Sequence, residues 1–80
     1  MTLPRDVSGD ALARGLGRVG YQITRPTGSH IRLTLDAAPQ HHLTTPAHAE
    51  LKAGSLSAIL SMAAQRLQLS REQLLAALKL

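Results

Sequence analysis

The segment from residue 30 to residue 35, His-Ile-Arg-Leu-Thr-Leu, alternates between polar and apolar side chains. Alternation with a period of two is typical of a β-strand that has one buried face and one face exposed to solvent. It predicts a strand from His30 to Leu35 whose polar face carries His30, Arg32 and Thr34. Because the apolar face of such a strand has to be buried, the chain is restricted to folds in which a sheet is covered on one side.

Two further segments, one on each side of this strand, also read as strands. They are residues 21–25, Tyr-Gln-Ile-Thr-Arg, and residues 41–45, His-His-Leu-Thr-Thr. We expect Tyr21 and Ile23 to face the core. Residues 26–29 (Pro-Thr-Gly-Ser) and 36–40 (Asp-Ala-Ala-Pro-Gln) predict turns. Proline at position 46 ends the third strand, so the three strands should form an antiparallel meander.

Helices are predicted before and after the strands. The first covers residues 8–20, with Ser8 as its N-cap and a glycine at its end. Ser55 is expected to cap a second helix that runs to about Leu67. A capping box over residues 70–73 then starts a short third helix. The order helix, three strands, helix and short extra helix predicts an α+β domain with two layers.

Composition bounds the size and surroundings of the protein. Eighty residues correspond to a single domain over residues 1–80. The chain has no cysteine, no apolar secretion signal and no membrane-length run of apolar residues, which fits a reducing cytoplasm. Its net charge of +4 favours a polyanionic or acidic partner. With Tyr21 as the single aromatic residue, RNA binding would depend on phosphates, hydroxyls and shape rather than on base stacking.

His30 follows a turn made by Gly28 and Ser29 and is the first candidate for a functional residue. Gly28 lets a backbone approach a ligand closely. Arg32, on the same face, can hold a phosphate, and Arg25 at the end of the preceding strand can reach the same region. An imidazole in this setting can transfer protons during RNA cleavage, in which the 2′-hydroxyl is the nucleophile and no metal is needed. The alternative is a surface histidine without a function.

The segment Lys-Ala-Gly-Ser at residues 52–55 is a second candidate. Gly54 and Ser55 at the start of a helix leave free N–H groups that can bind an anion, and Lys52 lies beside them. Ordinary helix capping explains Ser55 equally well. Phosphate binding and capping therefore remain alternatives here.

The other histidines do not predict a metal site. His41 and His42 are adjacent in a strand, so they should point to opposite faces. A proline loop separates His42 from His48, and neither cysteine nor carboxylates at ligand spacing accompany them. No phosphate-binding loop, dinucleotide fingerprint or metalloprotease motif is present. We therefore expect neither a metal nor a cofactor.

Together these segments resemble the HicA (YcfA-like) family of toxin–antitoxin mRNA interferases. The likeness covers about residues 8–78 and includes Arg-Pro-Thr-Gly-Ser-His-Ile-Arg-Leu (25–33), Thr-Thr-Pro-Ala-His (44–48) and Leu-Lys-Ala-Gly-Ser-Leu-Ser-Ala-Ile-Leu (51–60). The chain departs from the family in two places. It has Pro26-Thr27 where a basic or amide residue is frequent, and no second histidine or aromatic follows His30.

The resemblance implies a fold like that of double-stranded-RNA-binding domains: α-β-β-β-α, with helices on one face of a three-stranded antiparallel sheet, plus a short C-terminal helix. It implies a metal-independent endoribonuclease that cleaves mRNA with His30 as its single catalytic residue. It also implies a HicB-type antitoxin as partner. The residues expected to contact the RNA are Arg25, Gly28, Ser29, Arg32, Lys52 and Ser55.

Two alternatives remain open at this point. The same fold could be a non-catalytic module that binds RNA or a protein. The leucine-rich C-terminal segment could belong to the core, or it could form the interface of a homodimer or of a complex with a partner.

Overall fold

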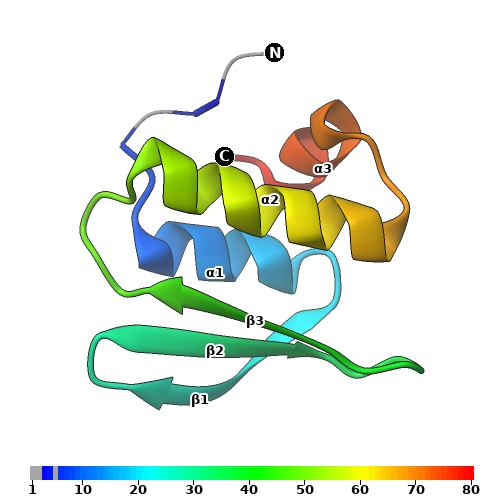
Figure 1. The fold of residues 1–80 in the computed structure, drawn as a ribbon, viewed down its shortest axis with the longest axis horizontal. Helices are drawn as coiled ribbons and strands as arrows, with labels where there is room; N and C mark the ends of the chain where they lie inside the picture. The colour runs from blue at the N-terminus through cyan, green and yellow to red at the C-terminus, as the bar shows by residue number, and fades with distance from the viewer. Residues whose placement is uncertain (1–2, 5) are drawn as a thin grey trace.

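The structure, a computed structural model, describes residues 3–4 and 6–80, and for residues 25–27 it describes the backbone alone. Its elements are α1 (Gly9–Gly17), β1 (Tyr21–Thr27), β2 (His30–Leu35), β3 (His41–Pro46), α2 (Ala53–Leu67) and α3 (Arg71–Leu78). The strands lie together on one side of the molecule and the helices on the other (Figure 1). The predicted α+β architecture is therefore confirmed. None of the described helices has the length and apolar character needed to cross a membrane.

The three strands form an antiparallel sheet in the order β1-β2-β3. β1 is longer than predicted, because Pro26 and Thr27 pair with Ile31 and His30 instead of forming a turn. Proline is tolerated here because β1 is an edge strand. The turn is reduced to two residues, and the first of them, Gly28, has a φ of 52°, which glycine adopts without strain.

Ile23 differs from the prediction that it would be buried. It lies opposite Leu33 in the sheet, so its side chain projects on the face that the helices cover. Leu33 is fully buried, whereas Ile23 is 51% exposed. The pairing register also shifts between Ile23 and Arg25. The helices thus cover the middle of the sheet at this level and leave its edge uncovered.

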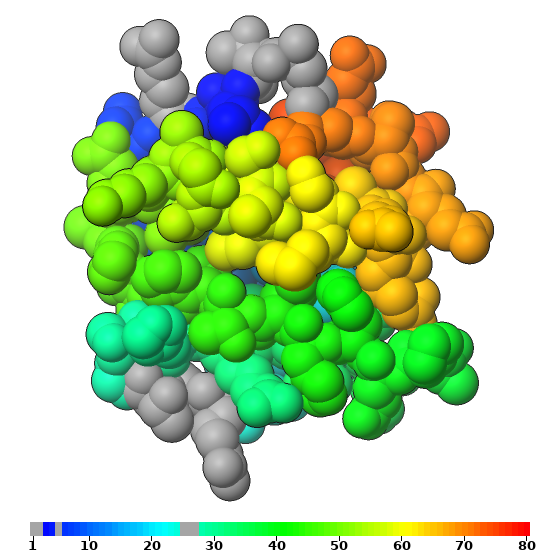
Figure 2. All heavy atoms as spheres, in the orientation of Figure 1, coloured from blue at the N-terminus to red at the C-terminus, as the bar shows by residue number. Residues whose placement is uncertain are grey.

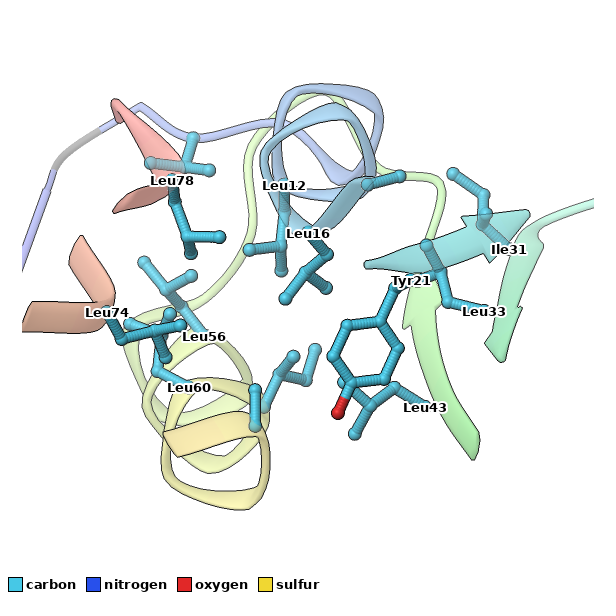
Figure 3. Packing of buried hydrophobic residues seen from close by; sticks show 14 of the residues in the cluster. Leu12, Leu16, Tyr21, Ile31, Leu33, Leu43, Leu56, Leu60, Leu74 and Leu78 are labelled. Atoms are coloured by element: carbon cyan, nitrogen blue, oxygen red, sulfur yellow. The ribbon is translucent and has the colours of Figure 1, made fainter. Parts of the chain in front are cut away.

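The core lies between the sheet and the helices (Figure 3). α1 starts as predicted, with the Ser8 hydroxyl accepting a hydrogen bond from Ala11 N at 3.0 Å. It ends at Gly17, three residues before the predicted end, and turn residues follow. The largest fully buried side chains come from all three helices and from the sheet: Leu12, Leu16, Leu33, Thr45, Leu56, Leu60, Leu74 and Leu78.

The C-terminal helix α3 is part of this core. The capping box of Ser70 and Gln73 is present, as predicted. Leu74 and Leu78 are fully buried, and the Arg71 guanidinium donates to the carbonyl oxygen of Ser57 on α2 at 3.1 Å. Of the two readings of the leucine-rich segment, the structure supports the core.

Candidate functional site on the open face of the sheet

His30 is the first residue of β2 and its side chain is exposed. Its Nδ1 lies 3.2 Å from the Ser29 hydroxyl. The Ser29 carbonyl accepts a hydrogen bond from Ala47 N at 2.7 Å, which ties the turn to the end of β3. No hydrogen bond to the described residues uses His30 Nε2. A proton carried on Nε2 can therefore pass to or from a bound molecule.

Arg32 follows His30 on the same face of β2 and is exposed. Residues two apart in a strand are separated by about 6.6 Å, so both side chains can reach one extended ligand. Arg32 pairs with Arg25 across the sheet. The side chain of Arg25 lies outside what the structure describes, so its predicted role stays a prediction.

A chain of hydrogen bonds crosses the open face next to Arg32. Thr24 Oγ1 lies 2.9 Å from Thr34 Oγ1, which lies 3.0 Å from His42 Nδ1. One residue from each strand contributes to this chain. Thr24, Thr34 and His42, together with Arg32 and Gln40, line a hollow of about 340 Å³.

Sequence reasoning placed His42 among the surface histidines and missed this hollow. The sequence feature that predicts the contact between Thr34 and His42 is the five-residue turn between β2 and β3. This turn sets Leu35 opposite His41 and therefore Thr34 opposite His42. Directly opposite residues of an antiparallel pair share a face. The predicted meander therefore already implies that His42 and Thr34 share the open face.

His41 points to the other face of the sheet, as predicted from its neighbouring position. Its Nδ1 lies 2.7 Å from the Tyr21 hydroxyl. Burial raises the pKa of Tyr21 above its usual value of 10.0, and the charge of Arg66 opposes part of this rise. Among the described residues, no three His, Cys, Asp or Glu side chains come close enough to hold a metal ion.

The second candidate site, residues 52–55 at the start of α2, has a different N-cap from the predicted one. α2 begins at Ala53, and its N-cap is Lys52, whose side chain makes no capping hydrogen bond. Leu56 N donates to the carbonyl oxygen of Lys52, so the helix starts before Ser55 can cap it. Ser55 lies in the first turn and is half-buried. Ser55 therefore does not cap α2.

The two candidate regions lie at the same end of the molecule but on different elements. The start of α2 and the turn between β1 and β2 are both at the left in Figure 1. In Figure 2 the beginning of β2 (teal) lies below the loop that leads into α2 (light green). No hydrogen bond between described residues joins Lys52 or Ser55 to His30. The structure thus places Gly28, Ser29, His30 and Arg32 on one turn and strand, and Lys52 and Ser55 on another segment at the same end of the molecule.

The charge of the open face favours anions. The three strands contain no Asp or Glu, while His30, Arg32 and His42 are exposed on this face. Asp36, in the loop after β2, accepts a hydrogen bond from Gln40 Nε2 at 3.0 Å. Arginine and histidine side chains without competing carboxylates suit phosphate groups.

These features define a small α+β protein with a sheet face that is open, polar and cationic. The family model described as the HicA toxin of bacterial toxin-antitoxin matches residues 9–65, which is well over half of the chain. The chain therefore belongs to the HicA toxin family, as its sequence motifs indicated, and has the role of a toxin with an antitoxin partner. The matched region includes His30, whereas α3 lies beyond it. No curated protein and no solved structure matches the chain.

Proposed function

We propose that this toxin is an endoribonuclease that cleaves mRNA without a metal ion, with His30 as its catalytic residue. One observation carries the proposal. In a chain of the HicA toxin family, the histidine of Gly28-Ser29-His30 is exposed at the start of β2, and Arg32 lies on the same face. No hydrogen bond from the residues that the structure describes engages its Nε2. The remaining proposed contacts with the RNA backbone are Arg25, Gly28, Ser29, Lys52 and Ser55.

The reaction follows from the chemistry of RNA. The 2′-oxygen attacks the adjacent phosphorus while the bond from phosphorus to the 5′-oxygen breaks. His30 accepts the proton of the 2′-hydroxyl or donates a proton to the leaving 5′-oxygen, and water serves the other role. Arg32 stabilises the charge that develops on the phosphate oxygens. The products would carry a 2′,3′-cyclic phosphate on one fragment and a 5′-hydroxyl on the other.

The proposal extends to the partner and the place of action. A HicB-type antitoxin would cover the open face, where it would block both His30 and Arg32. Since the substrate is mRNA, the toxin would act in the cytoplasm. Because Leu74 and Leu78 are used in the core, a homodimer through the C-terminal segment is not part of the proposal.

A second candidate function is a binding module without catalysis. It is favoured by the surroundings of His30, whose one side-chain hydrogen bond among the described residues is to its neighbour Ser29. Catalytic histidines are commonly oriented by a further carboxylate or carbonyl group. A module of this kind would bind RNA or a protein with the same face.

Cleavage of a long mRNA in the presence of a chelator tests the proposal, with His30→Ala as the variant. We expect the wild type to cut and the variant to be at least about 100-fold slower, because general acid–base catalysis typically contributes that much. The free energy of unfolding should change by less than about 0.5 kcal/mol, since His30 is exposed.

Each other outcome has a distinct meaning. Equal cleavage by both proteins would remove His30 from the mechanism. RNA binding without cleavage by either protein would establish the binding module. Cleavage by the wild type that stops when chelator is added would show that a metal ion takes part.

A further inference from the structure

We propose that the hollow on the open sheet face recognises the ribose of a nucleotide near the cleaved bond, with His42 Nε2 binding its 2′-hydroxyl. The inference rests on the proposed ribonuclease function and adds a residue to it. His42 would be a binding residue that selects RNA over DNA, and it would take no part in proton transfer.

The hydrogen-bond chain fixes the direction of the His42 ring. Nδ1 is engaged by Thr34, and Thr34 is in turn engaged by Thr24. Thr34 is only 7% exposed. If its hydroxyl rotated, it would lose its hydrogen bond to Thr24 or to His42 and could not replace that bond with one to solvent. The imidazole of His42 is exposed, and no hydrogen bond to the described residues uses its Nε2. The ring is therefore held at one nitrogen and offers the other to a ligand.

A hydroxyl group is the ligand that suits Nε2 in either tautomer. If Thr34 donates to Nδ1, the proton of the neutral ring is on Nε2, which then donates. If Nδ1 donates to Thr34, Nε2 accepts. A ribose 2′-hydroxyl both donates and accepts, so it pairs with Nε2 in both cases, and it is the group that distinguishes RNA from DNA.

His42 lies too far from His30 to act on the phosphodiester bond that His30 would cleave. His42 pairs with Thr34, which lies four residues beyond His30 on the same face. Four residues of strand span about 13 Å, too far for both imidazoles to act on one phosphodiester. Stacked nucleotides advance about 3.4 Å each, so the ribose would lie within about four nucleotides of the cleaved bond.

The rest of the hollow is consistent with a sugar–phosphate ligand. Arg32 lies between His30 and the Thr34–His42 pair and can bind the intervening phosphate. The sheet offers no aromatic side chain on this face, because Tyr21 is buried on the opposite one. Bases would therefore be read weakly, and contacts with the backbone would dominate.

A 2′-deoxy scan tests the inference directly. The uncleaving His30→Ala protein is titrated with a short RNA that contains the cleaved bond, and with copies that carry one deoxynucleotide at each position around it. We expect one or two positions, within about four nucleotides of that bond, to bind about three- to tenfold more weakly, the effect of one lost hydrogen bond. The same titrations are repeated with a protein that carries both His30→Ala and His42→Asn.

Asparagine is the informative substitution because its amide occupies the place of Nδ1 and can keep the bond to Thr34. It carries nothing at the place of Nε2. In the His42→Asn protein, we expect weaker binding of the all-ribose RNA and no further loss with the deoxynucleotide. Comparable free energies of unfolding for the two proteins show that the sheet is intact.

The outcomes separate this inference from the nuclease proposal. Two results overturn the inference even if the wild type cleaves RNA. One is a preference for the all-ribose RNA over a 2′-deoxy copy that persists in the His42→Asn protein. The other is the absence of this preference at every position in the protein that retains His42. Discrimination that depends on His42 supports it even if chelator stops cleavage by the wild type, which would overturn the metal-independent nuclease proposal. A protein that neither binds nor cleaves RNA overturns both.

Discussion

His30 and His42 lie on the same face of the sheet, and their surroundings differ in a way that suits the two roles proposed for them. His30 follows a two-residue turn, and among the described residues its side chain is hydrogen-bonded only to the neighbouring Ser29. His42 is held by a buried threonine in the middle of the sheet. A group that moves protons needs access to its ligand, whereas a group that recognises a hydroxyl needs a fixed direction. The two environments match these two requirements.

Arg32 can be tested against a matched arginine elsewhere. Arg14 is also exposed, but it lies in the last turn of α1, away from the sheet. We expect Arg32→Gln to weaken RNA binding by about 10-fold or more and to lower the salt dependence by about one phosphate contact, because the lost charge faces the ligand. Arg14→Gln, which removes the same charge, should have little effect. Equal losses in both variants would indicate non-specific attraction instead of a site on the sheet.

Tyr21 gives a prediction on pH. Burial favours the neutral phenol, so the pKa of Tyr21 is above 10.0 in the folded protein. Above about pH 10 the unfolded chain loses the phenolic proton while the folded chain keeps it. The folded state then binds more protons, so stability must fall as pH rises through this range. Because Tyr21 is the single aromatic residue, tyrosinate absorbance reports its titration directly, and the midpoint should exceed 10.0.

Tyr21→Phe is the control for this effect. At pH 8 it should cost about 1 kcal/mol, because the hydrogen bond with His41 is lost. Above pH 10 the variant should lose less stability than the wild type. Parallel stability curves for the two proteins would show that Tyr21 does not cause the loss.

At the scale of elements, the contact between α1 and β3 depends on a residue that sequence reasoning did not single out. Gly9 is the first residue of α1 and is buried. A Cβ atom at this position would collide with the carbonyl oxygen of Pro46 at the end of β3. Gly9 N also donates to the carbonyl oxygen of His48 at 2.9 Å. The helix therefore meets the strand backbone to backbone, close to the residue that pairs with His30.

Two identical substitutions in α1 test this contact. Gly9→Ala should destabilise the protein by about 1–3 kcal/mol, because backbone must move to make room. Gly17→Ala, at the other end of the same helix, meets no atom within 4 Å and should stabilise by up to about 1 kcal/mol. Urea denaturation measures both. A stabilising Gly9→Ala would mean that α1 and β3 are not in close contact in solution.

The start of α2 combines a weak cap with a basic residue. Lys52 has the extended conformation of an N-cap, with φ −67° and ψ 146°, but its side chain does not cap the helix. Lys52→Ser should therefore stabilise the protein by about 0.5–2 kcal/mol. If Lys52 contacts RNA as proposed, the same substitution should weaken RNA binding. A gain in stability with unchanged affinity would leave Lys52 a surface residue.

The caps and the edge of the sheet show what the sequence could and could not predict. Ser8 and Ser70 were recognisable because each precedes a periodic apolar pattern with a suitable spacing. Ser55 was misassigned, because no local signal shows that α2 begins two residues earlier, at Ala53. The alternation of apolar and polar residues in 21–25 predicts that Ile23 is buried. Its exposure depends instead on where the helices stop covering the sheet. That boundary is set by packing over the whole chain, so residues 21–25 could not reveal it.

For the whole molecule, the family match and the folded unit have different limits. The match ends at residue 65, whereas the core continues into α3 through Leu74 and Leu78. Arg18, the C-cap residue of α1, donates from Nη1 to the carbonyl oxygen of Leu78 at 2.9 Å. A chain of this size has a thin core and little stability in reserve. We infer that α3 is required for folding, although it lies outside the matched region and apart from the proposed site.

Leucines of the C-terminal segment allow this inference to be tested one residue at a time. Leu74→Ala and Leu78→Ala should each cost about 2–5 kcal/mol, because both side chains are fully buried and would leave cavities. Leu80→Ala is the matched control, since Leu80 is 39% exposed, and it should change stability by less than about 0.5 kcal/mol. Circular dichroism during urea denaturation gives all three values. Buried-leucine variants as stable as the control would mean that α3 is an appendage, and RNA cleavage by a chain shortened to residue 69 would then be expected. If α3 is part of the core, that shortened chain should be unfolded and inactive even though it retains His30, Arg32 and His42.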